Sequence, residues 1–142
     1  MLGIELLFFE PHGKYLSGNS IKGSKKTFDF GFTPFLDYLV TNDLIDDNTN
    51  RKIRKENFYR ISRCGIFHDM TIKSGLLIDS IHMESNKVFY PSPINNGILV
   101  SPWNFLSALK LYVEEYIDNV RLNAESDVSR KFSTTFNSLF QY

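Results

Sequence analysis

The chain lacks the features that mark several large classes of protein. Cysteine occurs once, at Cys64, so no disulfide can form within the chain and a disulfide-stapled secreted scaffold is excluded. Basic and acidic residues both total 16, and this zero net charge excludes the broad basic field of a histone-like nucleic-acid binder. The longest apolar run, Met1–Phe9, contains Glu5, lacks a basic flank and is too short to span a bilayer. We therefore expect a cytoplasmic protein with no membrane partner.

Common catalytic signatures are missing as well. The chain has no Gly-x-Ser-x-Gly elbow and no Gly-x-Gly-x-x-Gly turn. Its histidines, His12, His68 and His82, are too scattered for a zinc-finger spacing, so neither a metal nor a cofactor is expected. Gly18–Gly23, followed by Ser24-Lys25-Lys26-Thr27, resembles a phosphate loop, but the required Lys-Ser/Thr pair is displaced and no buried apolar strand precedes it. A flexible basic loop is the preferred interpretation.

The composition that is present indicates an ordinary globular chain. The length of 142 residues is typical of one domain, and apolar residues make up 42% of the chain. We find no internal repeat, low-complexity tract or linker that would divide it. Phenylalanine (13) and tyrosine (7) are abundant, which indicates an aromatic core. The prediction is a single domain over residues 1–142.

Helix signals dominate the first half of the chain. Apolar positions within Leu2–Phe9 predict a short helix that ends before Pro11, and residues 11–27 are predicted to form a loop because they are rich in glycine and polar residues. Thr33-Pro34 predicts the start of a second helix, since a proline at the first helical position forfeits no internal hydrogen bond. A third helix is expected from about residue 49 or 50 to Gly65.

Short strands are expected next, followed by two helices. The β-prone runs Leu76–Ile81, Val88–Tyr90 and Ile98–Val100 predict a small hairpin or a three-stranded meander. Ser101-Pro102 predicts the start of a long amphipathic helix, and Ser126 predicts the cap of a last helix. Four apolar residues of that last helix lie four apart: Val128, Phe132, Phe136 and Phe140. The predicted class is mostly α, a compact bundle of four to five helices with a small β-hairpin or meander insertion.

The segment 51–68 carries the strongest functional signal. Six basic side chains fall in it against one acid, Glu56, although the chain as a whole is neutral. Clustered lysine and arginine attract phosphate, and arginine grips it bidentately; alone, such a run is more often a solvated helix face. Five of the six are the predicted phosphate- or RNA-binding residues: Arg51, Lys52, Arg54, Lys55 and Arg60. The sixth is Arg63.

Arg63 and His68 enclose four residues at the end of the third predicted helix. The sequence Arg63-Cys64-Gly65-Ile66-Phe67-His68 resembles the Arg-x(4–6)-His signature of the HEPN family (higher eukaryote and prokaryote nucleotide-binding). Phe58-Tyr59 upstream, and the β-prone residues 76–90 that lead to the helix at Pro102, are also similar to one prokaryotic branch of that family. The resemblance implies a dimeric helical bundle and a metal-independent endoribonuclease of the toxin–antitoxin or phage-defence kind.

Carried over by position, the resemblance implies that Arg63 is the catalytic arginine and His68 the catalytic histidine. RNA can be cut without metal when its own 2′-OH attacks the adjacent phosphorus. A histidine with a pKa of about 6.5 can take up and return a proton, and a guanidinium can neutralise charge on the phosphate oxygens. Residues five apart on a helix point about 140° from one another, so we expect a homodimer to bring two copies of each residue together.

Aromatic residues give the homodimer a second line of support. Their number in the last two predicted helices exceeds what one small core needs. The residues concerned are Tyr112, Tyr116, Phe132, Phe136 and Phe140. We therefore expect some of these rings to lie at a contact between two copies of the chain.

Two alternatives to catalysis stay open. Active HEPN members usually have Asn, Asp or His directly after the arginine, whereas this chain has Cys64, which favours a non-catalytic module that binds nucleotide, RNA or a protein. In the other alternative, Arg63 caps carbonyls at a helix end and His68 hydrogen-bonds the backbone. The candidate partners are RNA or a nucleotide, a second copy of the chain, and an antitoxin or nucleotidyltransferase-like protein.

Overall fold

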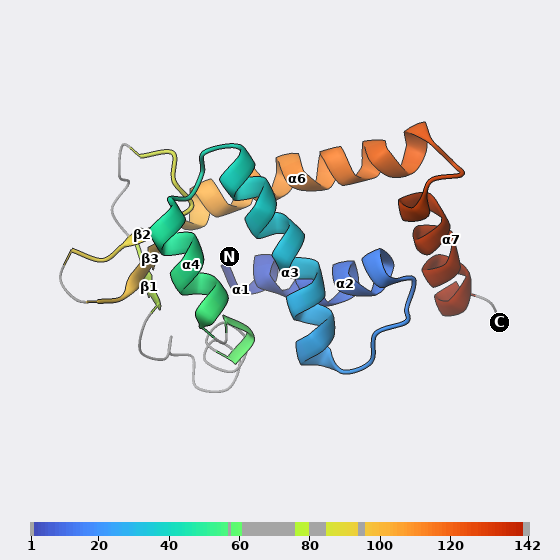
Figure 1. Cartoon of the computed structure of the whole chain (residues 1–142), viewed down its shortest axis with the longest axis horizontal. Coiled ribbons are helices and arrows are strands. Elements are labelled where there is room, and N and C mark those ends of the chain that lie inside the picture. Colours follow the sequence, from blue (N-terminus) through green and yellow to red (C-terminus); the bar gives the residue numbers. More distant parts are fainter. Residues whose placement is uncertain (1, 57, 61–75, 80–84, 94–95, 141–142) are drawn as a thin grey trace.

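The computed structural model describes residues 2–56, 58–60, 76–79, 85–93 and 96–140. The described elements, in chain order, are α1 (Leu2–Leu7), α2 (Phe9–Ser17), α3 (Ser24–Thr41), α4 (Asp47–Lys55), β1 (Leu76–Ile78), β2 (Phe89–Pro91), β3 (Ile98–Val100), α6 (Pro102–Leu122) and α7 (Asp127–Phe140) (Figure 1). A mostly helical chain with a small β insertion is therefore confirmed. Within the described part, no helix combines the length and the apolar character needed to cross a membrane.

Helices α1 and α2 form one nearly continuous arm. Phe8 between them keeps helical backbone angles, φ −58° and ψ −37°. Counted with this arm as one, the described helices number five, within the predicted range. The prediction that the first helix ends before Pro11 is wrong, because α2 continues to Ser17. Pro11 is tolerated because it lies in the first turn of α2, where its missing N–H removes no bond within that helix.

Helices α2 and α3 approach each other most closely at two glycines. A Cβ built on Gly13 would lie 1.9 Å from the carbonyl oxygen of Thr27, and one built on Gly31 would lie 2.2 Å from the carbonyl oxygen of Phe9. Only glycine fits at either position, because no side chain can share that space with a backbone oxygen. The loop predicted over residues 11–27 is therefore wrong at both ends. Gly13 lets two helices pack instead of breaking one.

The predicted helix start at Thr33-Pro34 is also wrong. Helix α3 begins at Ser24, and Pro34 lies inside it. The proline ring leaves the carbonyl of Phe30 without its helical N–H partner, a cost that a helix bears only when packing offsets it. Five side chains of α3, on both sides of the proline, are buried in the core: Phe28, Phe32, Phe35, Leu36 and Leu39.

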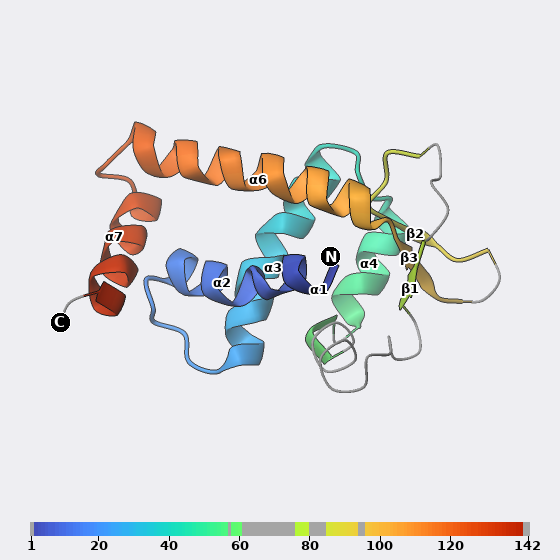
Figure 2. The same cartoon turned by 180° about the vertical axis from the view of Figure 1, so that it is seen from behind.

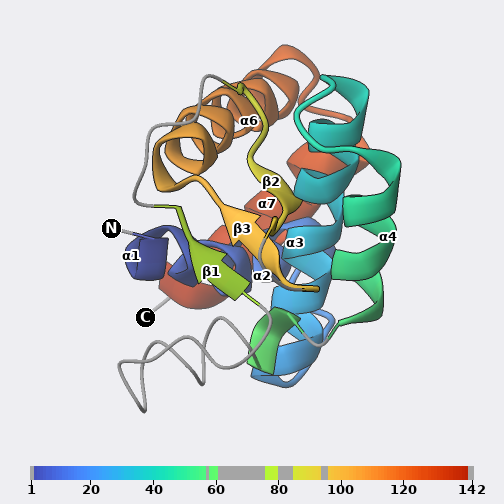
Figure 3. The same ribbon diagram turned by 90° about the vertical axis from the view of Figure 1, so that its left-hand side faces the viewer.

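The three strands form one small sheet in the order β1-β3-β2 (Figure 3). Strands β2 and β3 are antiparallel neighbours, with Tyr90 opposite Leu99, so the predicted hairpin is confirmed. Strand β1 pairs with β3 in parallel, with Leu77 opposite Leu99. The alternative of a meander is therefore excluded, because a meander would place β2 in the middle with antiparallel neighbours.

The starts of the last two helices are confirmed. Ser101 accepts a hydrogen bond from the backbone N–H of Asn104 at the start of α6, and Pro102 is the first residue of that helix. Ser126 accepts one from the backbone N–H of Ser129 at the start of α7. The apolar row of α7 is only partly covered by the rest of the chain. The ring of Phe132 stacks on that of Tyr15, with ring centroids 4.9 Å apart, whereas Phe136 and Phe140 are exposed.

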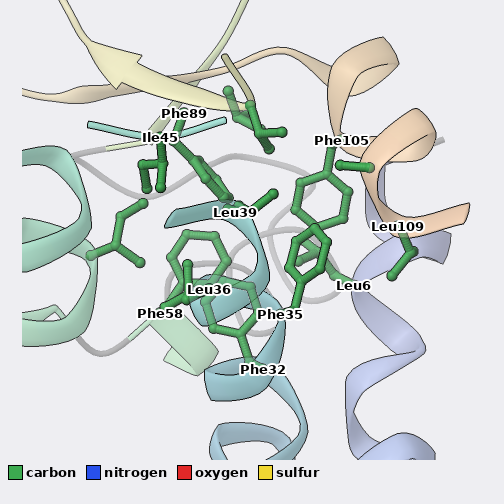
Figure 4. Close-up of a cluster of buried hydrophobic side chains, with 14 of the residues drawn as sticks. Leu6, Phe32, Phe35, Leu36, Leu39, Ile45, Phe58, Phe89, Phe105 and Leu109 are labelled. Carbon is green, nitrogen blue, oxygen red and sulfur yellow. The ribbon is translucent and has the colours of Figure 1, made fainter. Parts of the chain in front are cut away.

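The core is rich in phenylalanine, as predicted, and lies between α3, α6, the α1–α2 arm and the sheet (Figure 4). Phe35 and Phe105 are fully buried, with ring centroids 5.2 Å apart. Phe9 packs edge-on against Phe32 at 4.9 Å and against Phe105 at 6.2 Å. Such edge-to-face ring pairs stabilise a core beyond their buried area.

Candidate functional site

Helix α4 positions the predicted phosphate-binding residues. Asp46 begins it, since its carboxylate accepts hydrogen bonds from the backbone N–H of Thr49 at 2.9 Å and from the hydroxyl of Thr49 at 2.6 Å. Thr49 and Ile53 are buried, so the charged residues between and after them point outward. The predicted third helix is interrupted at Glu56, whose extended backbone angles end α4. Residues 58–60 are helical again, and residue 57 and residues 61–65 of the predicted helix lie outside the described residues.

Three of the five predicted cations are held by neighbouring groups, and Arg51 and Lys52 are the first two of them. Arg51 donates to Oδ1 of Asn48 at 2.7 Å and to the carbonyl of Asp47 at 3.3 Å, both on its own helix. Lys52 donates to the backbone carbonyl of Asn96, and to its Oδ1 at 3.3 Å. Lys52 therefore ties α4 to the chain just before β3. Both side chains serve local structure in this arrangement.

Arg54 joins α4 to α3. Its guanidinium forms an ion pair with Oδ1 of Asp37 at 2.5 Å, and its Nε donates to Oδ1 of Asn50 at 2.9 Å. Because the Asp37 side chain is 64% exposed, this pair contributes little to stability, about 0–1 kcal/mol. Its main effect is to hold the guanidinium beside α3.

A cleft of about 420 Å³ lies between α3 and α4. Its lining residues are Lys25, Asp29, Phe32, Thr33, Leu36, Ile53, Arg54, Lys55, Glu56 and Phe58. Among these described lining residues, three cations and two acids surround an apolar floor, an excess of one positive charge. Lys25 is paired with Asp29 at 2.7 Å, a contact between exposed side chains that a stronger anionic ligand can displace.

Lys55 is the predicted cation best placed to meet a ligand. Its side chain is exposed and lines the cleft. Among the described residues its ammonium group makes no hydrogen bond or ion pair, in contrast to Arg51, Lys52 and Arg54. An ammonium group at the rim of an apolar cleft attracts a phosphate group with little competition from the protein.

The structure places the remaining predicted residues only in part. Arg60 is exposed and follows Phe58, whose ring lines the cleft and stacks on Phe32 with ring centroids 4.7 Å apart. Arg63 and His68, together with Cys64 between them, lie outside the described residues, and so does Gly65, where the third helix was expected to end. Phe58, the last described residue that lines the cleft, lies five residues before Arg63 in the sequence.

Sequence analysis missed the α3 side of the cleft. Lys25, Asp29 and Thr33 recur every fourth residue, a spacing that puts them on one face of a helix. That signal was hidden by the expectation of a loop to residue 27 and a helix start at residue 33. The Gly18–Gly23 segment is indeed the turn between α2 and α3, but Lys25 and Thr27 belong to the first turns of α3.

A second group of titratable side chains is buried between the α1–α2 arm and α6. His12, only 3% exposed, shares a hydrogen bond of 2.8 Å with the hydroxyl of Tyr112, and its ring packs edge-on against Tyr116 at 4.8 Å. Burial lowers the pKa of His12 to about 4 and raises the pKa of Tyr116 to about 12. Because its pKa is lowered to this extent, His12 is neutral at pH 7. Glu5 is also buried, without a hydrogen-bond partner among the described residues, and burial raises its pKa.

The buried histidine makes stability depend on pH. Its pKa is about 6.5 in an unfolded chain and about 4 in the folded one, so the unfolded state binds more protons between these values and stability falls as pH falls. When the pH falls from 7.5 to 5, protonation of His12 in the unfolded chain is expected to lower the free energy of unfolding by about 2 kcal/mol. Urea unfolding of the wild type and of His12→Gln at both pH values measures this. The Glu5 contribution is common to both proteins, and equal pH dependence in the two would contradict the assignment.

No cluster of three or more His, Cys, Asp or Glu side chains that could hold a metal ion occurs within the described ranges. A comparison with models of known protein families, with curated proteins and with solved structures finds no match to the chain.

Proposed function

We propose that the protein binds RNA in the cleft between α3 and α4 and cleaves it without a metal ion, using Arg63 and His68. The observation that carries the proposal is the cleft itself: Lys25, Arg54 and Lys55 line it, and its last described lining residue, Phe58, lies five residues before Arg63 in the sequence. Cations at its rim suit the phosphates of an RNA strand, which repel one another unless they are neutralised. The HEPN-like Arg-x4-His motif supplies the chemistry.

The reaction proposed is transesterification within the RNA. The 2′-oxygen bonds to the adjacent phosphorus while the bond from phosphorus to the 5′-oxygen breaks, leaving a 2′,3′-cyclic phosphate and a 5′-hydroxyl. His68 accepts the 2′-OH proton and becomes an imidazolium, which then returns a proton to the leaving 5′-oxygen. Arg63 neutralises the charge that develops on the phosphate oxygens.

The wider proposal follows the resemblance. It includes a homodimer and a toxin or defence role in the cytoplasm, with an antitoxin or a nucleotidyltransferase-like protein as partner. Cys64 next to Arg63 favours a second candidate, a HEPN module that binds RNA, nucleotide or a protein and does not cleave. The two candidates share the cleft and differ in the fate of the bound RNA.

Incubation of purified protein with mixed RNA in excess chelator tests the proposal. We expect fragments to accumulate with time, because the 2′-OH mechanism needs only protein side chains. RNA that binds but stays intact would replace the nuclease by the binding module. RNA that neither binds nor breaks would overturn both candidates.

Lys55→Gln is expected to weaken RNA binding several-fold and to lower the salt dependence of binding by about one counterion, because the variant removes a cleft cation that has no partner among the described residues. Arg51→Gln is the matched control, since Asn48 and Asp47 already hold that guanidinium and it does not line the cleft. Fluorescence anisotropy with labelled RNA over a range of salt concentrations measures both. Equal losses in the two variants would show that the cleft has no special role.

A further inference from the structure

Helix α6 is much longer than the part of it that the core uses. It extends along the molecule from the sheet to α7 (Figure 2). Its buried residues all lie in its first half: Phe105, Ala108, Leu109 and Tyr112. From Val113 to Leu122 every residue is described and none is fully buried. Because isolated helices are marginal in water, a half-helix with apolar residues and so little burial suggests a further contact.

One side of α6, next to its core-facing residues, carries a regular apolar row. Its members alternate in spacings of three and four residues: Trp103, Leu106, Lys110, Val113, Ile117 and Val120. We call this row the α6 stripe. Trp103 is 61% exposed, Leu106 40% and Ile117 39%, whereas Val113 borders the core. Figure 3 looks along α6 and shows the helix at a corner of the molecule, with the other described elements on its inner sides.

The three-four spacing is the pattern by which two helices pack along a common seam. Apolar residues at the first and fourth positions of each heptad face a partner helix, and a single lysine among the first positions is a known device for fixing register. The α6 stripe follows this pattern over three heptads, with Lys110 as its one charged member. Tryptophan, the residue type of Trp103, is enriched among the residues that contribute most to binding at protein interfaces.

We propose that the α6 stripe is a homodimer surface, on which a second copy of the chain lays its own stripe in the antiparallel direction. With full overlap, the facing pairs are Trp103 with Val120, Leu106 with Ile117 and Lys110 with Val113. The largest side chain thus meets a small one, and by two-fold symmetry each pair occurs twice. This inference rests on the homodimer of the proposed function and names its surface. No stripe residue lines the cleft, so a monomeric protein that still cleaves RNA would overturn the surface and leave the cleavage proposal standing.

Charge selects the antiparallel direction. In that arrangement Lys110 lies over Val113 of the second copy, and Glu114 directly follows that valine, within reach of the ammonium group. In a parallel pair in register, two Lys110 side chains would face each other in the middle of the seam. Like charges in such a layer destabilise it, whereas the Lys110–Glu114 contact stabilises the antiparallel dimer twice.

Light scattering coupled to size-exclusion chromatography tests the surface. We expect the wild type to have the mass of two chains at micromolar concentration, and Ile117→Glu and Leu106→Glu to have the mass of one. Leu111→Glu is the matched control, because Leu111 is 53% exposed on the same helix but lies outside the stripe, and it should stay dimeric. Circular dichroism should show unchanged helix content in all three. A monomeric wild type, or a dimeric Ile117→Glu, would overturn the proposal.

The direction of pairing has its own test. With Cys64 replaced by serine, a spin label on Arg121→Cys reports the distance between the two copies. In the antiparallel dimer Arg121 faces Pro102 of the second copy, so two labels 19 residues apart are separated by about 28 Å along the helix axis. A parallel pair would bring the labels to about the helix–helix distance of 10 Å. That shorter distance would overturn the antiparallel arrangement.

Discussion

Gly31→Ala is expected to destabilise the protein by about 3 kcal/mol or more, and Gly13→Ala by a similar amount. On an ordinary helix the same change stabilises by about 0.5–1 kcal/mol, because alanine loses less backbone entropy on folding. Here the new methyl group would lie 2.2 Å from the carbonyl oxygen of Phe9, so α2 and α3 must separate. The expected effect is therefore opposite in sign to the helix propensity.

Urea unfolding followed by circular dichroism measures this effect. Lys26→Ala is a suitable control, since Lys26 is exposed on the same helix and its replacement should change stability by no more than about 0.5 kcal/mol. A Gly31→Ala protein that unfolds at the same urea concentration as the wild type, or a higher one, would show that α2 and α3 do not meet at these glycines.

The largest expected change in activity comes from the motif. His68→Ala should slow RNA cleavage by about 10²–10⁴-fold, because it removes the side chain that moves the proton. Arg63→Ala should slow cleavage by about 10²-fold or more and should also weaken RNA binding, since the phosphate loses a cation. Gel assays of RNA fragments over time, in chelator, measure both rates.

His82→Ala is the control for the histidine. It removes the same side chain from a position outside the motif and should leave the cleavage rate unchanged. All variants should keep the helix content and mass of the wild type. If His68→Ala cleaves RNA as fast as the wild type, Arg63 and His68 are structural residues at a helix end and the binding module becomes the better account.

The elements that sequence analysis predicted well depend on local signals. Ser101-Pro102 and Ser126 were recognised because a capping hydroxyl bonds a backbone N–H only three residues away. The β2–β3 hairpin was recognised because two β-prone runs flank a short polar turn. The parallel pairing of β1 with β3 was not, since it joins residues far apart in the chain and no local pattern encodes it.

The N-terminal third was predicted poorly because tertiary packing overrides its local signals. Pro11, Gly13 and Pro34 each read as a helix breaker when only neighbours along the chain are considered. In the fold, Gly13 is the point where α3 approaches α2. The burial of phenylalanines before and after Pro34 offsets the cost of a proline inside α3. A glycine that allows close packing and a glycine that forms a turn look alike in a sequence.

The candidate site was predicted only in part, because its contacts join segments that lie far apart in the sequence. The basic run identified α4 as charged, but it could not show that Asp37 on α3 would pair with Arg54 or that Asn96 would hold Lys52. It also missed Lys25, which reaches the cleft from α3. The catalytic assignment of Arg63 and His68 stays a prediction, resting on the motif.

The chemical ends of the RNA fragments test the central claim most directly. Wild-type protein is incubated with a defined RNA in excess chelator, and the same oligonucleotide with 2′-deoxyribose at the cleaved position serves as control. The mechanism predicts a 2′,3′-cyclic phosphate on one fragment, a 5′-hydroxyl on the other, and no cleavage of the deoxy substrate. Fragments with 5′-phosphate ends, or cleavage of the deoxy substrate, would contradict it.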